Sequence, residues 1–402
     1  MRAEDFTDTR PGRLVRDRRG FVAFVPDPLP PSTLPLDWEL AARLSEADRA
    51  LSELAGIART LPNPHLLIRP FVKREAVLSS RIEGTLASAF DLALFEAGGS
   101  APAAMSDAGE VRNYVRALEY GLGRLRDLPL SLRLLREIHR ELMTGVRGQH
   151  LTPGEFRRTQ NWIGTPGCSL TDATYVPPPV AEMTERLSAL EQYLHAPSAL
   201  PPLVRLALIH YEFEALHPFL DGNGRIGRLL ITLLLCAEGL LTQPMLYLSA
   251  YFERHRAAYY EHLLDVSRRG AWREWIAFFL RGVAEESSDA ARRTAQLLDV
   301  WQRYRGLAKA SVYQMRLVDE LFSSPAMNIA QVRRVLGVTA RAAQMNVDKL
   351  VAAGVLREAT GRRRDRVFIA PEIVAIIDAA KAPEPAAGSA LWPAAAAIAG
   401  KP

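Results

Sequence analysis

The stretch HPFLDGNGRIGR, residues 217–228, lies between two apolar segments at 201–216 and 225–239 whose periodicity predicts helices. Two glycines and an asparagine at 222–224 interrupt that periodicity, because these residue types favour a positive φ angle. Successive backbone N–H groups in such a loop can surround an anion, and the helix that follows adds its N-terminal donors. The sequence therefore predicts a helical protein with a phosphate-binding loop between two apolar helices.

Charged side chains around this loop indicate phosphate chemistry. Arg225 and Arg228 are three residues apart, so they share a helix face and could hold a di- or triphosphate. Asp221 offers an oxygen ligand for the Mg²⁺ that such a phosphate carries, and His217 can act as a general base near neutral pH. A GNG turn alone is common at protein surfaces, so the combination of residues favours the phosphate site.

The same run matches the full signature HPFx(D/E)GNGRxxR of the Fic (filamentation induced by cAMP) family, which the chain resembles over most of its length. The resemblance extends to YVPPP at 175–179, LYLSAYFERHRAAYY at 246–260 and a C-terminal winged helix. It implies a protein adenylyltransferase that moves AMP from ATP to a Ser, Thr or Tyr hydroxyl of a target protein and releases pyrophosphate. It also implies ATP as co-substrate and Mg²⁺ as cofactor.

The resemblance implies a role for each residue of the run. His217 would take the proton from the target hydroxyl, Asp221 would hold Mg²⁺, and Arg228 would reach the γ-phosphate. Phe219 would anchor the loop in the core while contributing to the ATP site. The other residues implied to contact phosphate oxygens are Gly222, Asn223, Gly224 and Arg225.

A second motif, SSRIEGT at 79–85, resembles the inhibitory helix (S/T)xxxE(G/N) of the same family through Ser79, Glu83 and Gly84. Ser79 and Glu83 are four residues apart and share a helix face. Glu83 could pair with Arg228 and deprive the γ-phosphate of its partner, so we count it among both the ATP-site and the inhibitory residues. The alternative is an ordinary helix end with a solvated glutamate.

Residues 150–179 interrupt the helical pattern with Pro and Gly and predict a β-hairpin or irregular flap. An extended edge can pair with a strand of a partner, so we expect the flap, roughly 160–178, to dock the target protein. A plain surface loop is the alternative. The flap residues expected to contact the target are Ile163, Gly164, Tyr175 and Val176.

Residues 246–260 resemble the nucleotide-base wall of the family. We expect Tyr251 and His255 to contact the base, although relatives often carry Asn where His255 stands. An amphipathic helix with Tyr259 and Leu263 directed inward would account for most of the same segment.

The coarse pattern predicts a mainly α protein, with a Fic helical bundle, a β-hairpin flap and a small α/β winged helix-turn-helix domain. Residues 1–36 are rich in Pro, Arg and Asp, and the stretch PDPLPPSTLP at 26–35 is expected to form an extended arm or a polyproline stretch. Further helices are expected at 38–61, 71–82, 107–123, 131–144, 180–195, 252–269, 271–285 and 288–310. We expect an N-terminal arm and regulatory helices at 1–105, a Fic catalytic domain at 106–290, a connecting helix at 291–311, a winged helix domain at 312–380 and a disordered tail at 381–402.

The positive charge of the chain is concentrated in the C-terminal part. The 402 residues carry a formal net charge of +5, and residues 331–370 alone hold nine basic and three acidic side chains. Arg341 on the expected recognition helix could contact DNA phosphates. The expected wing adds Arg362, Arg363 and Arg364. Many winged helices bind proteins instead, so DNA and protein both remain open as partners.

Several classes of protein are excluded by simple counts. Cys168 and Cys236 are the only cysteines, too few for a zinc cluster or a disulfide framework. The N-terminus lacks the apolar core of a signal peptide and no apolar run reaches the length of a membrane span, so we expect a cytoplasmic protein without a membrane partner.

The resemblance suggests a homodimer. Two other functions stay open: a DNA-binding regulator with a nucleotide-sensing Fic domain, and a bifunctional enzyme that also removes AMP.

Overall fold

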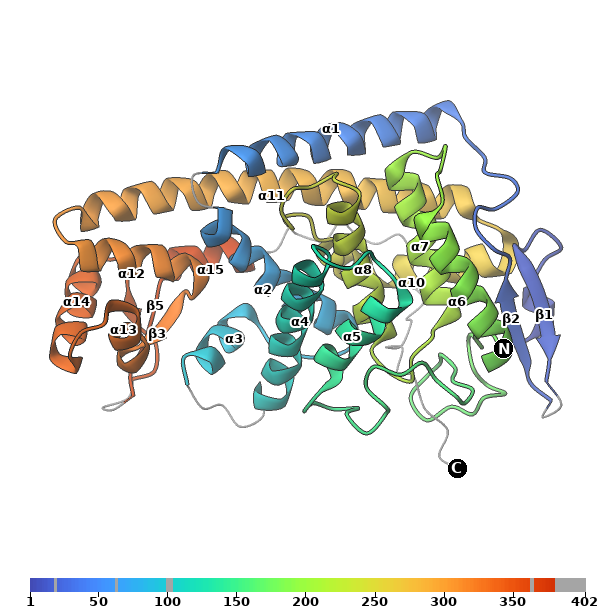
Figure 1. Cartoon of the computed structure of the whole chain (residues 1–402), viewed down its shortest axis with the longest axis horizontal. Coiled ribbons are helices and arrows are strands. Elements are labelled where there is room, and N and C mark those ends of the chain that lie inside the picture. The colour runs from blue at the N-terminus through green and yellow to red at the C-terminus, as the bar shows by residue number, and fades with distance from the viewer. Residues whose placement is uncertain (18–19, 62–63, 99–103, 362–364, 380–402) are drawn as a thin grey trace.

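The computed structural model describes residues 1–17, 20–61, 64–98, 104–361 and 365–379, and it confirms a mainly helical fold (Figure 1). The helices are α1 (Trp38–Thr60), α2 (Pro64–Ile82), α3 (Ala89–Glu96), α4 (Ala104–Arg124), α5 (Leu132–Met143), α6 (Val180–His195), α7 (Pro202–Leu216), α8 (Asn223–Ala237), α9 (Ser249–Arg254), α10 (Arg256–Arg269), α11 (Trp272–Ala308), α12 (Val312–Ser323), α13 (Ile329–Leu336), α14 (Ala340–Ala352) and α15 (Pro371–Asp378). The strands are β1 (Gly12–Arg16), β2 (Val22–Pro26), β3 (Ala326–Asn328), β4 (Arg357–Glu358) and β5 (Val367–Ile369). A short 3-10 helix, η1, covers Ala3–Asp5.

Helices α7 and α8 form the centre of the bundle. Nearly all residues of both helices are buried, as is typical of helices that neighbours surround on every side. α7 begins at Pro202, which is well suited to the first turn of a helix. The loop 217–222 connects α7 to α8, so the phosphate-binding segment predicted from the sequence lies between the two most buried helices.

The long helix α11 spans the molecule, and α1 lies along it (Figure 1). We expected two helices, 271–285 and 288–310, but α11 is continuous through residues 285–288 and through the domain boundary expected at 290. The polar residues that suggested a break are held inside the fold. Ser287 is fully buried, and Asp289 accepts a hydrogen bond of 2.6 Å from Arg293 Nε one turn later.

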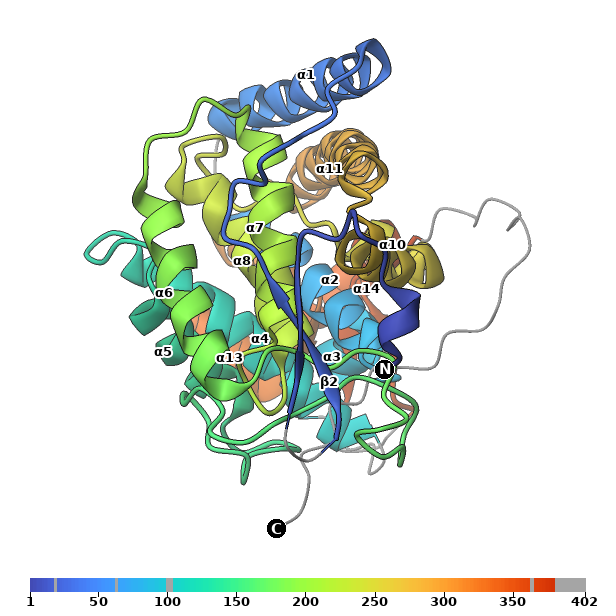
Figure 2. The ribbon, with the colours of Figure 1, turned by 90° about the vertical axis from the view of Figure 1, so that its right-hand side faces the viewer.

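The N-terminal segment contains a β-hairpin that was not predicted, whereas residues 27–37, which include most of the expected extended stretch, form neither helix nor strand. β1 and β2 pair antiparallel, with Leu14 opposite Phe24. The apolar run FVAFV at 21–25 supplies the buried residues of this hairpin, which packs on α6 and α7 (Figure 2). Phe24 N–H also donates to Val176 O at 3.0 Å, which ties the hairpin to the flap.

The C-terminal elements follow the order helix, strand, helix, helix, strand, strand, and their sheet has the strand order β3-β5-β4. A capping box between Asn328 and Gln331 starts α13, and Gly337 at φ 69° ends it. Arg341 is exposed on α14, whereas the predicted wing residues 362–364 and the predicted tail 381–402 lie outside the described residues. DNA binding therefore stays a prediction.

Side-chain hydrogen bonds attach these C-terminal elements to α2 and α3. Lys73 Nζ on α2 donates to Ser323 O at the end of α12, at 2.9 Å. Asn328 Nδ2 donates to Ala97 O at 2.7 Å, and Gln331 Nε2 donates to Glu96 O at 2.9 Å. The helix that carries the predicted inhibitory residues is thus fixed at its side to the C-terminal module.

Within the described ranges, every helix is too short or too polar to cross a bilayer.

Candidate active site

The loop after α7 begins with a strained residue. His217 caps α7 in the left-handed conformation, with φ 45° and ψ 59°, which costs a non-glycine residue about 1–2 kcal/mol. Two buried side chains compensate by binding its carbonyl oxygen: Arg157 Nε at 3.0 Å and Asn161 Nδ2 at 3.1 Å. Gly222 makes the second left-handed turn, at φ 77°, and begins α8. The backbone of the loop is therefore fixed from both sides.

Side chains behind the loop hold it in shape. Asn223 accepts a hydrogen bond from Phe219 N–H through Oδ1 and donates through Nδ2 to Phe219 O, both at 2.8 Å. The buried ring of Phe219 stacks on His139, with 3.8 Å between the ring centroids. His139 Nε2 lies 3.0 Å from Asp221 O, and burial lowers the pKa of His139 to about 4. A neutral His139 thus supports the loop from below.

A cavity with about 740 Å³ of empty space, including its open mouth, lies over this loop. The polar residues that line it come from the turn directly after α2, the loop and the start of α8: Glu83, His217, Asp221, Gly222, Asn223, Gly224 and Arg228. The lining residues from the flap, α7 and α10 are mostly apolar: Ile163, Tyr175, Tyr211, Glu214, Ala215, Tyr260, Leu263, Leu264 and Ser267.

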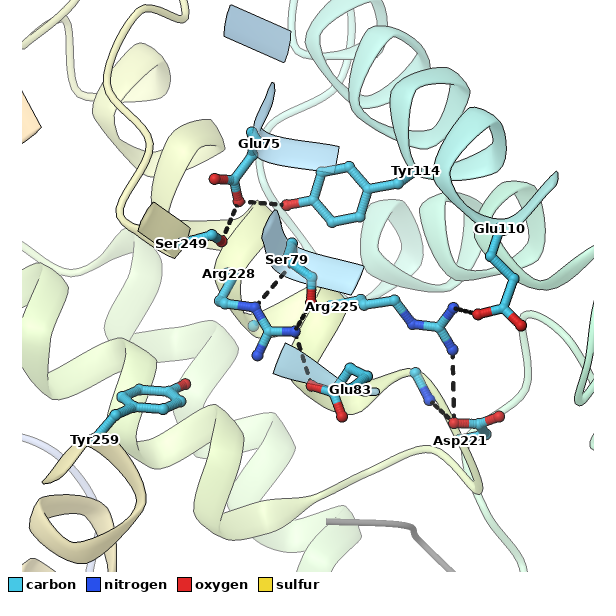
Figure 3. Close-up of polar contacts among 12 residues, drawn as sticks. Glu75, Ser79, Glu83, Glu110, Tyr114, Asp221, Arg225, Arg228, Ser249 and Tyr259 are labelled. Carbon is cyan, nitrogen blue, oxygen red and sulfur yellow. Dashed lines mark hydrogen bonds and ion pairs between the residues drawn. The ribbon is translucent and has the colours of Figure 1, made fainter. Parts of the chain in front are cut away.

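Arg228 is bound by Ser79 on α2 and by Glu83 in the turn after it, as Figure 3 shows. Its Nε donates to Ser79 Oγ at 2.9 Å, and its Nη2 donates to Ser79 O at 2.9 Å and to Glu83 Oε1 at 2.7 Å. Burial alone would lower the pKa of Arg228, but Glu83 raises that pKa to above its ordinary value. The pair is therefore charged and tightly coupled.

Glu83 also lies directly on the phosphate-binding loop. A Cβ atom at Gly224 would fall 2.3 Å from Glu83 Oε1, so only glycine leaves room for the carboxylate there. One turn before Ser79, Glu75 accepts hydrogen bonds from Tyr114 Oη and Ser249 Oγ, at 2.9 and 2.5 Å (Figure 3). Glu83, in the turn directly after α2, thus closes the cavity on the side of Arg228.

Arg225 does not face the cavity, contrary to the expectation that it shares a phosphate with Arg228. Its Nη1 donates to the buried Glu110 on α4 at 3.1 Å, and its Nη2 lies 3.6 Å from Asp221 Oδ1 (Figure 3). Two carboxylates thus hold the guanidinium behind the loop. Arg225 supports Asp221 instead of lining the site.

His217 presents its imidazole ring to the cavity. Burial, and secondarily the charge of Arg157, lowers the pKa of His217 from 6.5 to about 4. Nδ1 lies 3.4 Å from Glu214 O, which favours the tautomer that keeps a proton on Nδ1. The ring is therefore neutral near pH 7, with Nε2 available to accept a proton.

The predicted flap is much less regular than a hairpin. One antiparallel bridge joins Ile163 and Tyr175, and both side chains line the cavity. Gly164 and Val176 do not line it. The side chain of Val176 is buried, and its carbonyl already accepts the hydrogen bond from Phe24. The β-hairpin interpretation is therefore reduced to a single bridge, because the N-terminal hairpin covers that edge.

The residues expected to contact the nucleotide base do not line the cavity. Tyr251 is buried against Phe278, with 4.9 Å between the ring centroids, and His255 caps α9; neither lines the cavity. Ser79, Gly84 and Phe219 also lie outside its lining.

Seven residues line the cavity without having been predicted from the sequence: Tyr211, Glu214, Ala215, Tyr260, Leu263, Leu264 and Ser267. Tyr260, Leu263, Leu264 and Ser267 follow the helical spacing i, i+3, i+4, i+7 on α10. This spacing predicts that they share one face of the helix, but it does not predict what that face contacts.

Two family models match adjoining parts of the chain. The model described as Fic/DOC family N-terminal matches residues 41–123, which include Ser79 and Glu83. The model described as Fic/DOC family matches residues 129–235, from α5 to Arg228 and beyond. The two matches together contain both partners of the ion pair at Arg228.

Several known proteins resemble the chain in part. The protein adenylyltransferase Fic of Drosophila grimshawi is 30% identical over 156 residues, which are 38% of this chain and 29% of that protein. Its counterpart in Culex quinquefasciatus is 31% identical over 170 residues, 42% of this chain and 29% of that protein. This chain thus spans less than a third of the length of these relatives. The crystal structure of a Fic family protein from Desulfovibrio desulfuricans G20 covers 84% of this chain and 97% of its own, at a TM-score of 0.55 and 20% identity, which shows a shared fold.

Proposed function

We propose that this chain, which belongs to the Fic/DOC family by residues 41–123 and 129–235, is a protein adenylyltransferase that transfers AMP from ATP to a Ser, Thr or Tyr hydroxyl of a target protein. The proposal rests on one observation. A buried, neutral His217 lies beside a loop whose backbone N–H groups can bind an anion, and Arg228 lines the same cavity. The names of the curated relatives support the same activity.

The cavity has a polar part and a mostly apolar part, which suit the phosphates and the base of ATP respectively. The phosphates would contact the N–H groups at the start of α8, where the helix dipole favours negative charge. Arg228 would bind the terminal phosphate as a planar donor. The base would lie among the apolar side chains of α10 and the flap, including Leu263 and Ile163.

Asp221 fits the role of a magnesium ligand. Its carboxylate lines the cavity, its side chain is about a third exposed (31%), and Arg225 holds it from behind. Among the described residues no group of three or more His, Cys, Asp or Glu could hold a metal alone. One carboxylate together with substrate phosphates is a usual arrangement for Mg²⁺. When bound there, Mg²⁺ would neutralise phosphate charge.

The transfer step follows from the position of His217. Nε2 would take the proton of the target hydroxyl as its oxygen attacks the α-phosphorus of ATP. The bond from that phosphorus to the bridging oxygen of the β-phosphate breaks, and pyrophosphate leaves. Fixed N–H donors meet the charge that develops on the phosphate, which is the main source of catalysis in such transfers. The flap near Ile163 would position the target.

Glu83 would hold the enzyme inactive in this arrangement. Its carboxylate occupies Arg228 and the space over Gly224, where a terminal phosphate would bind. ATP could still enter through base and loop contacts, but its phosphates would lack their guanidinium. We infer that the chain is autoinhibited and that loss of the carboxylate releases it.

Transfer of label from ATP tagged at the α-phosphate tests the proposal. Glu83→Gly should label the chain itself or lysate proteins strongly, the parent chain weakly, and Glu83→Gly with His217→Ala not at all. ATP tagged at the γ-phosphate is the control, because that label leaves with pyrophosphate. Equal labelling with both forms, or labelling that survives His217→Ala, would contradict adenylyl transfer. Intact mass should show the gain of one AMP.

A DNA-binding role for the C-terminal elements is a second proposal. Arg341 is exposed at the start of α14, in the position of a recognition helix, and charge is concentrated in residues 331–370. A mobility shift at low salt that Arg341→Ala weakens would support this role. Binding without any effect of Arg341 would point to other contacts. Sedimentation would test the expected homodimer.

A further inference from the structure

Glu214 brings a second carboxyl group to the cavity, close to Arg228. It lies on α7, three residues before His217, and its side chain lines the cavity. Oε1 is buried and has no hydrogen-bond partner within the described part of the chain. A Cβ atom at Gly227 would fall 2.1 Å from that oxygen, so the glycine of α8 makes room for it. A buried oxygen without a partner is costly unless a ligand supplies one.

The charges around Glu214 determine whether its carboxyl group is protonated. Arg228 faces it from α8, Glu83 from the turn after α2, and Tyr259 and Tyr260 from α10. Arg228 forms its ion pair with Glu83, and the described ion pairs include none to Glu214. Burial raises the pKa of Glu214 to about 8; Arg228 opposes this shift and Glu83 adds to it. The guanidinium of Arg228 thus neutralises the carboxylate of Glu83, and the carboxyl group of Glu214 keeps its proton at neutral pH.

We propose that Glu214 is a nucleotide-binding residue whose protonated carboxyl group donates a hydrogen bond to an oxygen of the terminal phosphate. This inference rests on the proposed function, in which that phosphate replaces the carboxylate of Glu83 beside Arg228. A charged Glu214 would repel the phosphate, whereas a neutral acid supplies a donor in a fixed place. Glu214 therefore helps to select a triphosphate over a monophosphate.

The test compares ATP and AMP in a Glu83→Gly background. Glu214→Ala should raise the KM for ATP about ten-fold at pH 7, the loss expected for a hydrogen bond to a charged group. The affinity for AMP, which lacks the terminal phosphate, should be unchanged, and this also shows that the variant is folded. With Glu214 present, the KM for ATP should rise between pH 7 and pH 9 as the acid loses its proton. Glu214→Gln keeps a donor without titrating and should abolish that rise.

Glu212→Gln is a matched control, because Glu212 lies on the same helix and is also buried. Burial raises the pKa of Glu212 to about 8 as well, but its charged neighbours are Arg186 and Asp27, and it does not line the cavity. This variant should keep the pH dependence of the KM for ATP.

Three outcomes would overturn the inference: no change of KM in Glu214→Ala, an equal loss of AMP affinity, or the same rise toward pH 9 in Glu214→Gln. A different result would overturn the proposed function instead. If the Glu83→Gly chain transfers no AMP, that function fails, while titration of ATP and AMP into the same variants still decides the role of Glu214.

Discussion

Glu83 Oε1 lies 2.7 Å from Nη2 of Arg228, across a sequence separation of 145 residues. The side chain of Arg228 is almost completely buried, and Ser79 takes two further hydrogen bonds from the same guanidinium. A buried charge that loses its partner is costly unless another anion replaces it. A phosphate is such an anion, so α2 and the nucleotide compete for one group.

The competition predicts a nucleotide-dependent effect of Glu83→Gln. Glutamine keeps the shape of the side chain but removes its charge, so ATP should displace it more easily. We expect the affinity for ATP to rise ten-fold or more, corresponding to about 1.4 kcal/mol, while AMP affinity stays the same. Calorimetric titration of both nucleotides measures the difference. An equal gain for AMP would mean that Glu83 closes the whole cavity instead of competing at Arg228.

The pH dependence of transfer should show that His217 is neutral. Its neutral form is active, so activity persists above its pKa of about 4 and is lost only as the pH falls through that value. In the Glu83→Gly chain, kcat/KM should fall by less than about two-fold from pH 7.5 to pH 6. A histidine with the ordinary pKa would retain about a quarter of its neutral form at pH 6. A four-fold loss over this range would contradict the buried neutral base.

The loop carbonyls predict a role for Asn161. Its Nδ2 donates to His217 O at 3.1 Å and to Phe219 O at 2.9 Å. Asn161→Ala leaves both carbonyls with fewer donors, so the free energy of unfolding should fall by about 2–3 kcal/mol and kcat should fall about ten-fold. Urea unfolding and single-turnover transfer measure the two effects. Asn346→Ala, which loses a hydrogen bond to Ala342 O within α14, should lower stability slightly and leave kcat unchanged.

Local sequence located the loop but did not determine all of its conformation. Of residues 222–224, only Gly222 has the positive φ angle that the sequence favoured, whereas Asn223 and Gly224 belong to α8. The pairing of Glu83 with Arg228 followed from matching two separate motifs to one family. The orientation of Arg225 could not be predicted, because helix spacing says which residues share a face but not that Glu110, 115 residues away, binds one of them.

Tertiary contacts also decided where the fold departs from the predictions. The run FVAFV at 21–25 has a strand-like composition, yet no strand was predicted there; Val176 supplies a hydrogen-bond partner that the local sequence lacks. The polar run at 285–289 resembled a helix break. In the structure Arg293 neutralises Asp289 inside α11, and the helix continues. Arg74 on α2 also lies 3.7 Å from Glu286 and 3.8 Å from Asp289, so a distant segment helps to hold this polar run inside the fold.

The attachment of α2 to the C-terminal module predicts how strongly Glu83 inhibits. Lys73 Nζ donates to Ser323 O at 2.9 Å and to Glu96 Oε2 at 2.6 Å, and the side chain is almost fully buried. Lys73→Met keeps the apolar stem but removes both hydrogen bonds, so α2 should hold Glu83 over Arg228 less firmly. Transfer by the chain with Glu83 intact should rise several-fold.

Two comparisons show whether this rise acts through inhibition. In the Glu83→Gly background Lys73→Met should have no effect, because nothing remains to be released. Arg69→Met is the control on the same helix: Arg69 lies 3.9 Å from Glu119 with both side chains about half exposed, and such pairs contribute little. That variant should leave transfer unchanged in either background. An equal rise for Lys73→Met with and without Glu83 would show that Lys73 acts on catalysis and not on the position of α2.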